Sequence, residues 1–78
     1  MNTIEAVRLA RHAVRNRAHR DELGALIDFA ANNAGSHDVS CFIETLVCYR
    51  DLGINDQPLG VSVCRSIDIV VAALRRRT

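Results

Sequence analysis

The stretch LGVSVCRSIDIVVAAL, residues 59–74, decides the fold class. Its β-branched residues, with Val61 and Val63 and then Ile67 and Ile69 in alternation, are also typical of strands. At helical pitch, however, one set of its apolar residues falls within an arc of roughly 80°, and no turn signal divides the stretch. We therefore predict a helix, with a pair of strands as the alternative. The residues of this arc are Leu59, Val63, Ile67, Val70 and Leu74.

Two further apolar sets with helical spacing lie in the first half of the chain. Asn2 and Glu5 form a capping box, so a helix is expected to begin there. If that helix continued without a break, the second apolar set would lie roughly 160° around its axis from the first. We therefore predict a break near residues 19–22, with Asp21 capping the second helix. The first set is Ile4, Val7, Ala10, Val14 and Ala18; the second is Leu23, Leu26, Ile27, Ala30 and Ala34.

Two glycines mark the ends of the middle helices. Gly35 follows the second helix and Gly53 follows the third, and glycine is the residue that most easily ends a helix. Ser36 is expected to cap the third helix, and Pro58 to lie in the first turn of the fourth. The sequence thus predicts a single all-α domain over residues 1–78, a small four-helix bundle of two antiparallel hairpins. The main face of the third helix is Val39, Phe42, Ile43, Leu46 and Val47.

Length and composition limit the protein class. The chain has 78 residues, of which 49% are hydrophobic and 24% charged, and this composition excludes a disordered protein. The longest apolar run, residues 69–74, is far shorter than the roughly 20 residues that span a membrane. A domain this small is marginally stable alone, so we expect a homodimer.

The third and fourth predicted helices each carry a second stripe of apolar or small residues. Such stripes either pack on other helices of the bundle or form an intermolecular contact. We predict an apolar interface from these stripes, with burial inside one bundle as the alternative. The interface residues are Cys41, Cys48, Leu52, Ser62, Ser66, Ile69 and Ala73.

Charge is divided into blocks of alternating sign. Residues 1–20 carry a net charge of +4, residues 21–56 of −6 and residues 57–78 of +3, and all ten basic residues are arginine. A cationic stripe is predicted along the first helix, continuing to His19 over roughly 16 Å. It is expected to bind an acidic partner or phosphate, with a solvated helix face as the alternative. The predicted residues are Arg8, Arg11, His12, Arg15, Arg75, Arg76 and Arg77.

The sequence lacks the motifs of common enzymes and metal sites. Cys41 and Cys48 are seven residues apart on one helix, about 10 Å along its axis, so they cannot share a zinc ion. No phosphate-binding loop or nucleophile motif occurs. We therefore predict no metal, no cofactor and no enzymatic activity. We also expect no signal peptide, and reduced, mostly buried thiols in the cytoplasm.

These observations favour a non-enzymatic protein-interaction module that acts as an adaptor, inhibitor or regulator by occupying a partner's surface. The small size also fits the antagonists that phages and mobile elements carry. One alternative is a nucleic-acid-binding regulator that uses the arginines of the first helix and of the C-terminal end. Another is capture of a small anion, such as a nucleotide, at a subunit boundary. A membrane partner is not expected.

Overall fold

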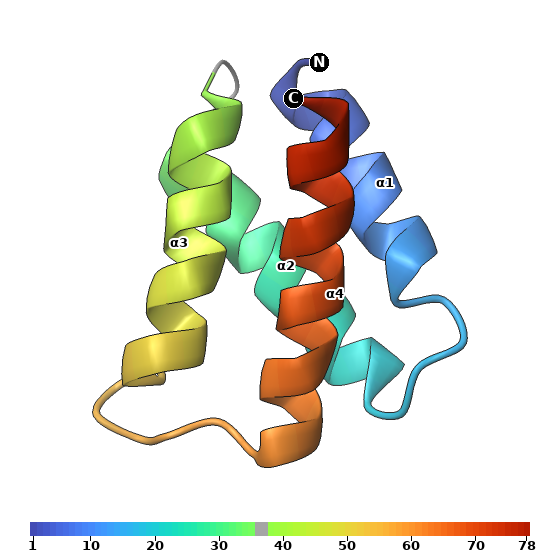
Figure 1. The fold of residues 1–78 in the computed structure, drawn as a ribbon. Coiled ribbons are helices and arrows are strands. Elements are labelled where there is room, and N and C mark those ends of the chain that lie inside the picture. Colours follow the sequence, from blue (N-terminus) through green and yellow to red (C-terminus); the bar gives the residue numbers. More distant parts are fainter. Residues whose placement is uncertain (36–37) are drawn as a thin grey trace.

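The computed structural model describes residues 1–35 and 38–78, and it is all-helical (Figure 1). Residues 61–77, which include most of the stretch for which helix and strands were the alternatives, form a helix. The described residues contain no strand beyond an isolated bridge between Ile54 and Gln57. The prediction of an all-α fold is therefore confirmed. The four helices are α1 (Thr3–Ala13), α2 (Arg20–Ala34), α3 (Val39–Leu52) and α4 (Val61–Arg77).

The helices pack around one aliphatic core. Figure 1 shows α3 and α4 side by side, with α2 crossing behind them and α1 beside α4. The chain ends, at the start of α1 and the end of α4, lie at the same end of the bundle. Ala6 and Ala10 of α1 are fully buried, and the largest fully buried side chains come from α2, α3 and α4. These side chains are Leu23, Ile27, Phe42, Leu46, Ile67, Val70 and Leu74.

Side-chain caps begin two of the helices. The Asn2 Oδ1 atom accepts a hydrogen bond of 2.9 Å from the Glu5 amide, as predicted. In α3 the Asp38 Oδ1 atom accepts one of 3.1 Å from the Cys41 amide. The predicted cap, Ser36, lies outside the described residues. The structure makes Asp38, two residues further along the chain, the cap of α3.

The Asp38 cap predicts a pH dependence of stability. The hydrogen bond from the Cys41 backbone lowers the pKa of Asp38 below its ordinary value of 3.8. The charged cap therefore stabilises the fold fully above that value, and this contribution is lost as the pH falls through the folded pKa. Asp38→Asn keeps a capping oxygen without a charge, so its unfolding free energy is expected to fall less steeply in acid. Urea unfolding between about pH 5 and pH 2 measures this difference, and parallel curves would contradict the assignment.

The break between α1 and α2 comes earlier than predicted. α1 ends at Ala13, and residues 14–19 form the connection. Asp21 lies in the first turn of α2, whereas His19, in the left-handed conformation at φ 62°, takes the cap position without a side-chain hydrogen bond. This turn allows both Val14 and Leu23 to be buried, and an unbroken helix would separate them.

The buried side of α1 also differs from the prediction. Thr3, Ala6 and Ala10 face the core, whereas Ile4 is 63% exposed. Ala18 lies in the connection and is exposed. Ala10 and Val14 are buried as predicted, so the face is rotated by roughly 60°, toward Thr3 and Ala6; α1 packs most closely on α4, a contact that helical spacing alone does not specify.

Pro58 was also misplaced. α4 begins at Val61 after Gly60, so Pro58 lies in the loop before it rather than in its first turn. The loop folds back on the end of α3, where Ile54 and Gln57 exchange two backbone hydrogen bonds of 2.9 Å. Residues 54–57 therefore form a turn directly before Pro58, and α4 begins three residues after Pro58.

The prediction of mostly buried thiols is wrong. Cys41 and Cys48 are exposed and Cys64 is half-buried, and all three are free. The Cys64 sulfur lies 3.6 Å from the Arg50 carbonyl oxygen. Among the described helices, none has the length and hydropathy needed to cross a bilayer.

Candidate functional site

An aromatic pair joins α2 to α3 at the surface. The rings of Phe29 and Tyr49 stack with centroids 5.9 Å apart and planes inclined by 25°. The Asn33 side chain donates a hydrogen bond of 3.1 Å to the Tyr49 hydroxyl oxygen, which fixes the ring. Phe29 nevertheless remains 52% exposed, so one large apolar side chain is held in place without being covered.

A shallow apolar groove of about 430 Å³ lies beside Phe29. Ala25 and Leu26 line it from α2, Ile54 lines it from the loop after α3, and Glu22 and Asn55 lie at its edges. Leu52, at the end of α3, is 76% exposed. We call this surface the α2–α3 apolar face, and it consists of Ala25, Phe29, Cys48, Tyr49, Leu52 and Ile54.

The stripe predicted on α3 lies on the outside of the bundle. Cys41, Cys48 and Leu52 are all exposed. Leu52 follows Cys48 by four residues and Tyr49 by three, so it adjoins both on the helix surface. The predicted stripe therefore continues into the α2–α3 apolar face. Sequence reasoning missed Phe29, because only the fold brings it next to α3, and it missed Ile54, because the turn after α3 decides where that side chain lies.

The stripe predicted on α4 is divided between the inside and the outside of the bundle. Ser62 is exposed, Ile69 is 38% exposed and Ala73 is half-buried. Ser66 is buried, and its hydroxyl donates a hydrogen bond of 3.0 Å to the Ser62 carbonyl oxygen. The assignment of Ser66 to an outer interface is therefore wrong, because the bundle itself covers this side chain.

The predicted cationic stripe is continuous only in part: Arg8 and Arg11 line one shallow hollow, and Arg11 and Arg15 line another. Arg8 and His12 are exposed on α1, and Arg11 forms an ion pair with Asp28 of α2. Arg15 lies beyond the end of α1, so it leaves the line that an unbroken helix would have continued to His19. Arg75, Arg76 and Arg77 are exposed in the last turn of α4, at the opposite end of the bundle from the α1–α2 connection (Figure 1).

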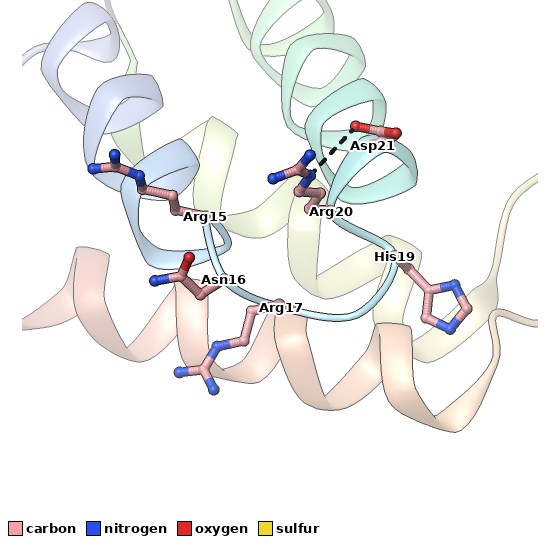
Figure 2. A pocket seen from close by; sticks show the side chains of 6 residues that line it. All are labelled: Arg15, Asn16, Arg17, His19, Arg20 and Asp21. Carbon is pink, nitrogen blue, oxygen red and sulfur yellow. Dashed lines mark ion pairs between the residues drawn. The ribbon is translucent and has the colours of Figure 1, made fainter.

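A different group of arginines gathers at the connection between α1 and α2. Arg15, Arg17 and Arg20 line a shallow, open hollow of about 500 Å³ together with Asn16, His19 and Asp21 (Figure 2). We call residues 15–20 the cationic turn. Arg17 and Arg20 were not predicted as site residues, although the run of three arginines in six positions is visible in the sequence.

The second polar cluster is an ion-pair network between α3 and α4. Arg50 contacts Asp68 of α4, and its Nη1 atom lies 3.0 Å from the Asp51 Oδ1 atom. Hydrogen bonding to Asp68, and then to Asp51, raises the pKa of Arg50. Arg50 is the single cation of residues 21–56, and both partners are acids, so it adds no free positive charge to the face.

Reactive groups are sparse in the described part of the chain. Within it, no group of three His, Cys, Asp or Glu residues could hold a metal ion. Hydrogen bonding to Asp38 raises the pKa of the Cys41 thiol, which keeps this exposed sulfur protonated near neutral pH. The absence of enzymatic activity stays a prediction.

No family model, curated protein or solved structure matches the chain.

Proposed function

We propose that the chain is a non-enzymatic interaction module that binds a partner protein on the α2–α3 apolar face, as an adaptor, inhibitor or regulator. The observation that carries this proposal is the exposure of Phe29 and Leu52, at 52% and 76%, on adjoining helices. Contiguous apolar surface of this kind on a small domain is typical of an interaction site.

The face has the composition of an interface centre. Burial of a Phe or Leu side chain stabilises a complex by about 1.5–3 kcal/mol, and aromatic anchors often dominate binding energy. Phe29 is already held by Tyr49, so binding costs it little conformational freedom. Small neighbours such as Ala25 leave room for a partner side chain in the groove.

The charge around the face favours a cationic partner. Glu22 lies at the groove edge, and Glu44 and Asp51 adjoin Cys48 on the helix surface. Residues 21–56 hold seven acids against one arginine, and that arginine is paired with acids. We infer that the occupant is a helix with apolar anchors flanked by Lys or Arg, because opposite charges steer association and exclude wrong partners.

A second copy of the chain meets part of this description. Residues 1–20 and 57–78 are net positive, and residues 21–56 are net negative. We propose that the two hairpins, α1–α2 and α3–α4, run antiparallel and that two copies associate through opposite charges.

The free thiols fit a reducing compartment such as the cytoplasm.

Phe29→Ser with Leu52→Ser is expected to lower affinity for a host partner by roughly tenfold or more, because both anchors are lost. The tagged chain captures partners from the host, and each captured protein is then titrated against the purified variants. Val61→Ser is the matched control, since Val61 is 70% exposed and lies at the start of α4, outside the face. Equal capture by the unchanged chain, the double variant and Val61→Ser would contradict the proposal.

A further inference from the structure

The cationic turn carries positive charge that the fold leaves largely unpaired. Among the described residues, Arg15 and Arg17 form no ion pair, whereas Arg11 and Arg50 each contact an acid of another helix. The Arg20 Nε atom lies 3.9 Å from the Asp21 Oδ1 atom, and both side chains are largely exposed. An exposed pair at this distance is weak, so a ligand can displace it.

The backbone that carries these arginines is fixed. The Arg15 amide donates a hydrogen bond of 3.2 Å to the His12 carbonyl oxygen, and the Arg17 amide donates one of 3.0 Å to the Val14 carbonyl oxygen. On either side of the turn, Val14 and Leu23 are anchored in the core. The charges therefore extend from an ordered support, which reduces the entropy that binding would cost.

The side chains spread outward rather than enclosing a space. Figure 2 shows Arg15, Arg17 and His19 pointing in different directions from the turn, with Arg20 beside Asp21. The hollow is open and these side chains point apart, so the turn of one chain does not enclose a small anion; nucleotide capture at a subunit boundary stays a prediction. The turn suits a ligand that presents many negative charges at successive positions.

We propose that the cationic turn binds the phosphate backbone of double-stranded nucleic acid without reading its sequence. Arginine forks form paired hydrogen bonds with phosphate, and duplex DNA presents about one charge per 1.7 Å. Residues 15–20 contain no Phe, Tyr or Trp on which single-stranded bases could stack. Their one aromatic ring is the imidazole of His19, against three arginines that can contact phosphate, and their one apolar residue is Ala18. A duplex therefore fits the turn better than a single strand or a bilayer.

Two triple variants separate local charge from net charge. Arg15→Gln, Arg17→Gln and Arg20→Gln together remove three positive charges, and so do Arg75→Gln, Arg76→Gln and Arg77→Gln at the other end of the bundle. Affinity for a duplex of about 20 base pairs is measured by fluorescence anisotropy at several salt concentrations. The turn variant is expected to bind at least tenfold more weakly, and its salt slope to fall by about 2.7, because each phosphate contact contributes about 0.9. The C-terminal variant loses the same net charge at the opposite end of the bundle, so its affinity and salt slope are expected to change less than those of the turn variant.

Three outcomes would overturn the proposal: no duplex binding at low salt, equal losses in both triple variants, or tighter binding to polyglutamate than to duplex. The last would assign the turn to an acidic protein instead. Circular dichroism verifies that the variants fold. If the triple turn variant unfolds, Arg17→Gln alone replaces it, and the salt slope is then expected to change by about 0.9. The variant with Phe29→Ser and Leu52→Ser is expected to keep duplex binding, so this proposal and the protein-binding proposal fail separately.

Discussion

Gly53→Ala is expected to lower the free energy of unfolding by about 3–5 kcal/mol. Gly53 has φ 76° and ψ −164°, a backbone region that is essentially limited to glycine. A Cβ atom there would lie 2.0 Å from the Gln57 carbonyl oxygen, which is backbone and cannot rotate away. Relief of this clash requires the turn between Ile54 and Gln57 to open and lose its hydrogen bonds.

Gly35→Ala is the matched control. Gly35 has a similar backbone conformation, with φ 80° and ψ 170°, but no atom of the described residues that are not its chain neighbours lies within 4 Å of an added Cβ atom. Its cost is therefore limited to backbone strain of about 1–3 kcal/mol. Urea unfolding of the two variants compares these costs, and equal losses would show that the loop after α3 is not packed as described.

Phe42→Ala is expected to cost about 3–5 kcal/mol, because Phe42 is fully buried at the centre of the core and the smaller side chain leaves a cavity. For a domain of this length the total stability is roughly 4–12 kcal/mol, so the variant is expected to lose at least a quarter of it and to unfold at a clearly lower temperature. Thermal unfolding followed by circular dichroism measures the change.

Phe29→Ala controls for the loss of an aromatic ring. Phe29 is half exposed and stacks on Tyr49, so its removal is expected to cost about 1 kcal/mol. If this variant unfolds as readily as Phe42→Ala, Phe29 belongs to the core and the α2–α3 apolar face is not a free surface.

Local signals in the sequence were sufficient for much of the fold. Asn2, Gly35 and Gly53 mark helix ends through their own side chains or backbone freedom, and each lies where the structure begins or ends a helix. The spacing of Val63, Ile67, Val70 and Leu74 favoured a helix over strands for residues 59–74. All four side chains are buried in the structure. Such features depend on neighbours within a few positions, so they can be read without the fold.

Features that depend on contacts between distant residues were not predictable. The rotation of α1 places Thr3 in the core, where its hydroxyl oxygen has no hydrogen-bond partner among the described residues, and leaves Ile4 outside. No glycine or proline marks the end of α1 at Ala13, so Arg15 was assigned to a helix face instead of a turn. The exposure of Cys41 and Cys48 has the same origin, since no helix of the described chain covers that side of α3.

The candidate site was half visible in the sequence. Helical spacing alone identified Cys41, Cys48 and Leu52 as a second stripe on one helix. Phe29 joins this stripe only through its stacking on Tyr49, which is 20 positions further along the chain. The acids of residues 21–56 could be read as a charge block. That Glu22 lies at the edge of an apolar groove could not be read from the sequence.

Hydroxyl-radical footprinting tests the central claim most directly. Side-chain oxidation is compared between the purified chain and the chain in native host lysate, at matched radical dose. If the α2–α3 apolar face holds a partner, Phe29, Tyr49 and Leu52 are oxidised less in lysate, whereas Ile4 and Val61, which are 63% and 70% exposed elsewhere on the surface, are unchanged. Equal oxidation of all five residues in both samples would contradict the account.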